Sequence, residues 1–412
     1  MSGSCRTFGA LGPAAYTCPG MTLDTLLELA ASRTDPYVES LREMVNIDSG
    51  SYTPDGVNRI ADLCEKRFRA GGWEVERRPH RAGEGAPEQL GDLVIGRRPG
   101  SGPRLLMIGH MDTVFPEGTV AERPLTIDGT TVHGPGVSDM KGGLLFGFLA
   151  TELLEEAGVG RDLDLTYVCN PDEEIGSPFS GPIIKAMAPG FAATFVMEAA
   201  RENGDVVSSR KGVSDFRIEI RGRAAHAGVE PEKGRNAILE AARKTIELQE
   251  LNGRWSGVSV NVGVIEGGTR SNVVPERCLL KVDVRSSAEE TMVEAEERVK
   301  RIAEANGVPD VTSSVTWGSW HRPFEKKGGS AVLAQEAIRI ARDLGFELSD
   351  APTGGASDAN TTSAAGVPTL DGLGPVGGND HSPAEWSDIA SVPQRLALLA
   401  GLLSEAPAAL GR

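Results

Sequence analysis

The stretch Leu105-Leu-Met-Ile-Gly-His110-Met-Asp112 decides the fold and supplies the first potential metal ligand. Its apolar run is nearly continuous, as expected for a strand of a parallel sheet that is covered on both faces. The run ends in a histidine and an aspartate two residues apart, which share one face of an extended segment. Ligands of open α/β sheets bind at the carboxyl ends of the strands. We therefore expect a buried strand that presents a polar pair at a binding edge.

Four more segments end a buried run or a glycine-rich loop in a potential metal ligand. They are Gly134-Pro-Gly-Val-Ser-Asp139, Leu165-Thr-Tyr-Val-Cys-Asn-Pro-Asp-Glu173-Glu174, Phe195-Val-Met-Glu198 and Gly377-Gly-Asn-Asp-His381. Histidines and carboxylates together suit a pair of divalent ions such as zinc. The sequence thus predicts metal ligands at His110, Asp139, Glu174, Glu198 and His381.

Each motif taken singly has an ordinary alternative. Asp139 has the position of a cap for the helix that follows, and Glu173-Glu174 resembles a solvated acidic turn. The combination favours a metal centre, because two of only six histidines fall in it. Adjacent carboxylates are costly unless a cation or a proton offsets them, so one can bind metal while the other stays free as a general base. The chain has no HExxH motif, which excludes the single-helix zinc protease plan.

The remaining patterns predict a split α/β domain. Strands and helices alternate from residue 21 to about residue 210 and again over 323–412, which favours a mostly parallel sheet with helices on both faces. Residues 211–322 show the order β-α-β-β-α-β, which is the ferredoxin-like arrangement. We predict an α/β catalytic domain that is interrupted by this second domain, and a disordered tail over residues 1–20.

Composition limits the classes of partner. The net charge of -16 argues against nucleic acid or an anionic membrane as a main partner. Five cysteines without a CxxC pair fit a reducing compartment. No run reaches the length of a transmembrane helix, and residues 1–20 lack the apolar core of a secretory signal. We expect a cytoplasmic protein that acts on a small molecule.

As a set, the motifs resemble the co-catalytic zinc aminoacylase and carboxypeptidase family, which includes glutamate carboxypeptidase, acetylornithine deacetylase and succinyl-diaminopimelate desuccinylase. The matching motifs are His110-Met-Asp112, Asp139-Met-Lys-Gly-Gly, Asp172-Glu173-Glu174-Ile-Gly, Glu198 and His381, and the resemblance runs from about Met21 onward. It implies two zinc ions, with cobalt or manganese as substitutes. His110, Asp139 and Glu198 would hold one ion, and Asp139, Glu174 and His381 the other. Asp112 would orient His110, and Glu173 would be the general base for a bridging hydroxide.

The resemblance extends into the second domain, which in this family is a lid that makes a homodimer. Ala225-His226-Ala-Gly resembles the segment whose histidine reaches the active site of a partner subunit. Asn272, Arg285 and Arg322 match residues near the substrate carboxylate, and arginine makes a planar two-point contact with such a group. From the residues alone, His226 reads as an ordinary surface histidine and Arg285 equally as a solvated strand-end charge.

The preferred function is a two-zinc amidohydrolase or exopeptidase that cleaves an amide bond of an N-acyl or peptidyl amino acid of glutamate-like type. An N-acyl amino acid deacylase of the acetylornithine deacetylase or aminoacylase type is the first alternative. The second is a non-catalytic binding homologue, against which the intact Glu173 argues. The third is the same site running amide chemistry in the synthetic direction.

Overall fold

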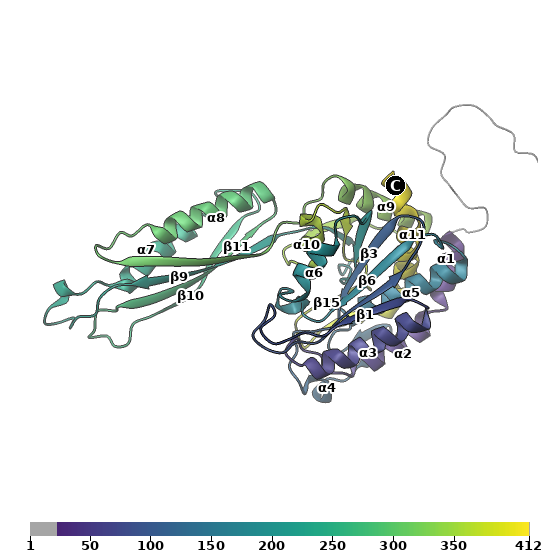
Figure 1. The fold of residues 1–412 in the computed structure, drawn as a ribbon, viewed down its shortest axis with the longest axis horizontal. Helices are drawn as coiled ribbons and strands as arrows, with labels where there is room; N and C mark the ends of the chain where they lie inside the picture. The colour runs from purple at the N-terminus through teal and green to yellow at the C-terminus, as the bar shows by residue number, and fades with distance from the viewer. Residues whose placement is uncertain (1–22, 412) are drawn as a thin grey trace, which may run out of the picture.

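The computed structural model describes residues 23–411, so the tail predicted over residues 1–20 lies outside the described residues. Figure 1 shows two bodies, a large one around the central sheet and a small one that contains β9, β10, β11, α7 and α8. The chain leaves the large body once, after β8 (Val206–Arg210), and returns once, after β12 (Thr312–His321). The small body is therefore an insertion in the large one.

The central sheet has six strands in the order β1-β2-β6-β3-β7-β14. They are β1 (Glu74–Arg78), β2 (Leu93–Arg98), β3 (Arg104–His110), β6 (Asp164–Asn170), β7 (Ala193–Val196) and β14 (Thr369–Leu370). The last four in the spatial order are parallel, whereas β1 and β2 add an antiparallel edge. The predicted mostly parallel sheet is confirmed, and the carboxyl ends of β3, β6 and β7 meet at one edge.

Helices cover both faces of this sheet because its buried side chains alternate. Leu105 and Met107 of β3 belong to one core, and Leu106 and Ile108 to a second. Each such side chain stabilises the fold by about 1.5–3 kcal/mol on burial. The first core is closed by α1 (Leu23–Ala31), α2 (Thr34–Val45), α3 (Pro54–Ala70), α5 (Lys141–Ala157), α9 (Gly329–Asp343) and α11 (Val392–Ala409), and the second by α6 (Ser180–Met187) and α10 (Asp358–Ala364).

The small body is an antiparallel sheet in the order β10-β11-β9-β12 with two helices on one face. Its elements are β9 (Gly212–Arg221), α7 (Ala237–Gln249), β10 (Ser259–Gly267), β11 (Arg277–Ser286), α8 (Glu289–Glu304) and β12. Phe216 and Ile218 of β9 are buried under the helices, whereas Asp215 and Arg217 lie on the open face. The predicted ferredoxin-like order is confirmed, with one sheet face left open.

Short elements surround the edge where β3, β6 and β7 end, and the sequence patterns do not predict them. Strands of two to four residues are too short to show a period. A four-stranded sheet joins β15 (Gly377–Gly378), β16 (Trp386–Asp388), β5 (Thr131–His133) and β4 (Thr126–Asp128), and β8 pairs with β13 (Asp350–Thr353). The single-turn elements of the large body are α4 (Thr119–Glu122), η1 (Glu173–Ile175) and η3 (Ile389–Ser391), and η2 (Pro231–Lys233) belongs to the small body.

One predicted boundary is shifted. The sequence predicts a helical pattern over residues 22–47 that is interrupted near Pro36, but α1 ends at Ala31 and α2 starts at Thr34. Pro36 instead lies in the first turn of α2, where the amide that proline lacks would have no intrahelical partner.

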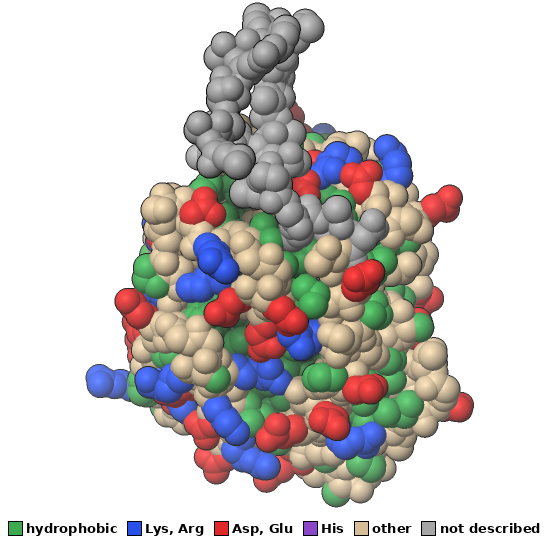
Figure 2. Space-filling view, turned by 90° about the vertical axis from the view of Figure 1, so that its right-hand side faces the viewer, with side chains coloured by type: hydrophobic (Ala, Val, Ile, Leu, Met, Phe, Trp, Pro, Cys, Tyr) green, Lys and Arg blue, Asp and Glu red, His purple; other side chains and the backbone are tan. Residues whose placement is uncertain are grey.

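The outer face of the large body, on the side away from the small body, has no large patch of only acidic or only basic side chains. Figure 2 shows acidic and basic side chains interspersed over this face. Within residues 23–411, no helix has both the length and the apolar composition that a membrane span requires.

Candidate metal centre

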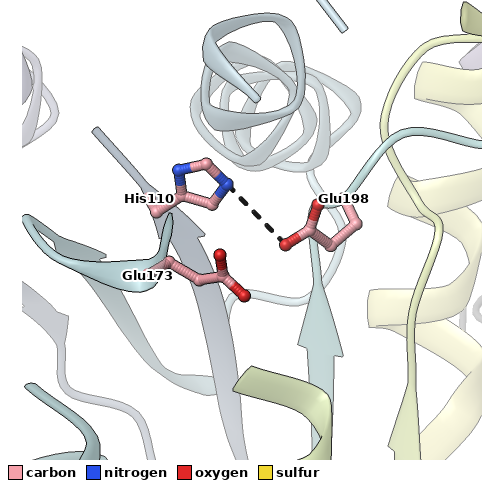
Figure 3. A group of neighbouring side chains, drawn as sticks. All are labelled: His110, Glu173 and Glu198. Carbon is pink, nitrogen blue, oxygen red and sulfur yellow. Dashed lines mark ion pairs between the residues drawn. The ribbon is translucent and has the colours of Figure 1, made fainter. Parts of the chain in front are cut away.

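The predicted ligands converge where the parallel strands end. His110 is the last residue of β3, Glu174 lies in η1 after β6, and Glu198 follows β7. Asp139 lies in the loop before α5, and His381 in the loop between β15 and β16. Figure 3 shows His110, Glu173 and Glu198 pointing toward one another from separate elements. Segments distant in sequence thus share one site because the sheet order brings their strands together.

His110 is held in one orientation by its neighbour two residues on. Its Nδ1 lies 2.9 Å from the Asp112 carbonyl oxygen and 3.4 Å from the Asp112 carboxylate. An Nδ1–H donated to that carbonyl leaves Nε2 as the ligand atom. The nearer partner is therefore the carbonyl of Asp112, whereas the sequence predicts its carboxylate. That carboxylate accepts hydrogen bonds from Ser51 Oγ and from the amides of Glu173 and Glu174.

Asp139 faces both histidines with a different oxygen. Its Oδ1 lies 3.0 Å from His110 Nε2, and its Oδ2 lies 3.0 Å from His381 Nε2. Glu174 Oε2 lies 3.0 Å from His381 Nε2, and Glu198 Oε1 lies 3.8 Å from His110 Nε2. The donor atoms thus form two groups. One group contains His110, Asp139 and Glu198, and the other contains Asp139, Glu174 and His381. Asp139 belongs to both, as a carboxylate that bridges two ions must.

The site concentrates more negative charge than its protein cations offset. Burial, with Glu198 as the next cause, raises the pKa of Glu173 well above its usual range. Burial and then Asp139 raise the pKa of Glu198 in the same way and that of Glu174 to about 7. Hydrogen bonds to Asp139 and Glu174 raise the pKa of His381 to about 11. The three glutamates thus resist ionisation, whereas at Asp139 burial is outweighed by hydrogen bonds with both histidines, which hold the pKa of that carboxyl below its usual range.

The residues present fit a pair of divalent cations. Glu174 Oε1 is buried without a hydrogen-bond partner among the described residues, as a free ligand atom would be. Oxygen and imidazole donors of this kind suit zinc and its neighbours in the first transition row. Two such ions would offset the burial, and then the repulsion, that hold the pKa values of Glu173, Glu174 and Glu198 above their usual range.

Glu173 faces the same cluster. Its carboxylate lies within 4.8 Å of donor atoms of His110 and Glu198, so these three residues could together hold an ion. Glu173 makes no ion pair with either histidine among the described residues. Its backbone amide is fixed by Asp112 Oδ1 at 3.2 Å, and its carboxylate is within reach of a group bound at the cluster.

Two buried acids hold the site's loops: Glu385, which the sequence reasoning missed, and Asp358, which ends a segment, Gly354-Gly-Ala-Ser-Asp358, that resembles a pocket loop of the family. Glu385 accepts hydrogen bonds from the amides of Gly136, Ser138 and Asp139, and so fixes the loop that carries Asp139. Asp358 accepts from Ser177 Oγ and Asn170 Nδ2, which flank the Glu173-Glu174 segment. No local pattern marks a carboxylate that binds distant backbone amides, although the four-residue spacing from His381 to Glu385 was a weak signal.

The small body corresponds to the predicted lid and is called the lid from here on. Its predicted site residues lie in two separate places. His226 and Asn272 lie on adjacent exposed loops, and the Asn272 carbonyl accepts from the amide of Ala227. These loops follow the end of β9 that is remote from the large body, and ten residues of strand span about 30 Å. The structure therefore does not bring His226 to the metal centre of its own chain.

Arg285 and Arg322 lie at the other end of the lid, near the junction. Arg285 Nη1 donates to the Gly354 carbonyl of the large body at 3.1 Å. Arg322 pairs with Glu289 and Glu296 of α8, each at 2.7 Å, so its guanidinium is directed into the lid. A substrate contact for Arg322 stays a prediction, and one that requires these ion pairs to break.

Comparisons with known proteins agree with this architecture. Residues 106–405 match Peptidase family M20/M25/M40. Carboxypeptidase G2 of Pseudomonas sp. (strain RS-16) is 29% identical over 396 residues, which cover 95% of this chain and 94% of that protein. The crystal structure of aminopeptidase PepT from Bacillus cereus ATCC 10987 has a TM-score of 0.76 at 24% identity and covers 90% of this chain and 98% of that one. The YXEP protein of Bacillus subtilis, a dinuclear metal-binding peptidase of the M20 family, has a TM-score of 0.65 at 17% identity and covers 91% and 98%.

Replacing Asp139 tests the shared-ligand arrangement. Asp139→Ala should abolish tight binding of both ions, because one oxygen faces each histidine. Elemental analysis after dialysis against zinc would measure the metal content. Asp128→Asn is the control, since it removes an exposed carboxylate of β4 outside the site. An Asp139→Ala protein that retained two zinc ions per chain would remove Asp139 from the centre of the site.

Proposed function

The chain belongs to Peptidase family M20/M25/M40 and is a hydrolase of peptide or amide bonds, and from this premise we propose that it is a two-zinc exopeptidase or amidohydrolase for N-acyl or peptidyl amino acids of glutamate-like type. The observation that carries the proposal is the position of Glu173. This carboxylate lies among the converging ligands with its amide anchored by Asp112, and it forms no ion pair with either histidine in the described part of the chain.

In this proposal Glu173 moves the proton of the reaction. When bound, two zinc ions would polarise the scissile carbonyl and supply an activated water at neutral pH. A Glu173 oxygen accepts a proton from the attacking water and then donates it to the leaving amide nitrogen. Both steps need a carboxylate within reach of a group bound at the cluster, and the position of Glu173 beside donor atoms of His110 and Glu198 meets that need. Asp112 fixes the positions of Glu173 and His110 relative to each other. Its carboxylate accepts from the amide of Glu173, and its carbonyl oxygen contacts Nδ1 of His110.

Glu173→Gln tests the assignment of the base. The variant keeps the shape of the side chain but cannot take a proton, so turnover should fall about 10²–10⁴-fold. Zinc content and melting temperature should stay close to wild type. A hydrolysis assay with N-acyl glutamate and dipeptide substrates measures the rate, and Glu202→Gln, an exposed carboxylate, is the control. A kcat near the wild-type value would show that another group is the base.

The proposed substrate class rests on the lid cation nearest the large body. A substrate with a free carboxylate needs an offsetting cation in a site already crowded with acidic groups. Arg285 contacts the Gly354 carbonyl and is held from behind by Asp283 at 3.1 Å. Its guanidinium therefore lies at the junction between the lid and the large body. The similarity to carboxypeptidase G2 over nearly the whole chain supports a substrate of the carboxypeptidase type, which has a free carboxylate.

Arg285→Ala tests the class of substrate. Loss of a charge-assisted contact typically costs about 1.5–3 kcal/mol, so kcat/KM for free acids should fall about 10- to 100-fold. The same substrates with the carboxylate converted to an amide should lose much less. Arg277→Ala, at the other end of β11, controls for the loss of a lid charge. Equal losses on acid and amide would make Arg285 structural and favour a more general deacylase.

We also propose that the active unit is a homodimer formed through the lid. β10 is an edge strand, and α7 beside it exposes Leu239 at 53% and Ile246 at 62% of their surface. An unpaired edge and exposed apolar side chains together suit a second copy of the chain. Such a partner would also give a role to His226, which is remote from its own metal centre. Its proposed role is to stabilise the oxyanion in the partner's site.

Mixing two inactive variants tests this role in trans. His226→Ala should lower kcat with little change in zinc content. Mixed with Glu173→Gln, it should regain part of the wild-type rate, because a heterodimer has one site with both groups intact. Chromatography with differently tagged chains would verify subunit exchange. Exchange without recovered activity would mean that His226 acts in cis or not at all.

The proposed compartment is the cytoplasm. Cys64, Cys169 and Cys278 are free, buried thiols in the described part of the chain. Such thiols fit a reducing environment.

A further inference from the structure

One side chain contacts both chain crossings between the large body and the lid. Asn360 of α10 donates from Nδ2 to the carbonyl of Lys211, at 3.2 Å, and to the carbonyl of Arg322, at 2.8 Å. Lys211 directly precedes β9, and Arg322 directly follows β12. Asn360 is fully buried, and its Oδ1 accepts from the amide of Ser357 at 3.0 Å. A single amide group therefore fastens both ends of the lid to one helix of the large body.

The two crossings are themselves packed against each other at this point. Arg210 and Phe324 exchange backbone hydrogen bonds of 2.8 and 3.0 Å just outside the contact with Asn360. Gly212 lies so close to the other crossing that an added Cβ would be 2.7 Å from the ring of Pro323. The lid therefore leaves the large body through a narrow paired stem, and Asn360 holds that stem.

The first turn of α10 also holds the catalytic loops. Asp358 binds Ser177 and Asn170, on either side of the segment with Glu173. Ser357 Oγ donates to Asp371, which accepts from the buried Arg210 side chain. The stem of the lid and the loop of the general base are thus fixed to adjacent residues of the same helix.

We propose that Asn360 is a positioning residue that sets the distance between the lid's contact for the substrate carboxylate and the metal centre. The inference rests on the proposed function, in which Arg285 binds the carboxylate and the large body performs the chemistry. These two groups belong to bodies joined covalently only by the stem that Asn360 holds. A displacement of about 1 Å between reacting groups can cost about 100-fold in rate, so the stem must be fixed for both groups to meet one substrate.

The test removes the donor but keeps the helix. Asn360→Asp retains an acceptor for the amide of Ser357 and loses the donor to both carbonyls. Thr362→Val is the matched control, because it removes a buried hydrogen bond of the same helix that does not touch the stem. Small-angle X-ray scattering of the zinc-loaded protein measures how far the lid extends. Kinetics with paired acid and amide substrates, and zinc analysis, complete the measurement.

We expect Asn360→Asp to broaden the distribution of interatomic distances and to lower kcat/KM for acids about 10- to 100-fold. Zinc content and the rate on amides should change little, and Thr362→Val should behave as wild type. Scattering unchanged by Asn360→Asp, or broadened equally by both variants, would overturn the proposal. A wild-type protein that hydrolyses neither substrate would instead refute the proposed function, and the scattering comparison would still test the stem.

Asn360→Ala, which introduces no charge, replaces Asn360→Asp if the latter fails to fold. Hydrogen exchange on the wild-type protein gives a further measurement that needs no variant. The amides of Arg210, Lys211 and Phe324 should be as protected as those of the central sheet. Exchange at the rate of exposed loops would show that the stem is not held and would also overturn the proposal.

Discussion

The repulsion among carboxylates buried at one sheet edge is the constraint on which the rest of the structure depends. Asp139, Glu174 and Glu198 lie around two histidines, with Glu173 beside them. Burying like charges together is costly, and histidine offsets only part of the cost. The raised pKa values of the three glutamates record that imbalance. Two divalent cations would offset this repulsion. They would also join the five segments of the chain that supply the potential ligands.

A second group of buried acids keeps this edge in shape before any cation binds. Asp112 accepts two amides of the η1 turn, Glu385 accepts three amides of the Asp139 loop, and Asp172 accepts the amides that begin α6. Hydrogen bonds from backbone amides to ionised carboxylates are among the stronger ones in proteins. Each acid therefore fixes a loop whose backbone would otherwise lack partners in the interior. Some of the acids around the site could therefore bind cations, while others hold the backbone of the surrounding loops.

The sequence predicts the potential metal ligands well, but it does not predict the buried acids that hold the loops. His110, Glu174 and Glu198 each end a buried apolar strand, so periodicity and sheet topology together predict that they meet. Glu385 and Asn360 act on backbone atoms distant in sequence, and a backbone amide or carbonyl has no residue type to recognise. The two bodies and the succession of strands and helices in each follow from alternation, whereas the spatial order of the strands does not. The short strands β15 and β16 have too few residues to show a period. Arg322 is the instructive case, because its motif points to substrate while its side chain pairs with Glu289 and Glu296.

Separating the chemistry from substrate recognition gives the two bodies different physical requirements. The large body must hold charged groups within fractions of an ångström, and it does so with two packed cores and loops tied down by buried acids. In the proposed dimer the lid would present Arg285 and His226 at opposite ends of one sheet, about 30 Å apart. One end of the sheet would then serve the metal centre of its own chain, and the other end would serve that of a second copy. The length of β9 supports the proposed shared active site, because one extended strand holds the two ends of the sheet far apart.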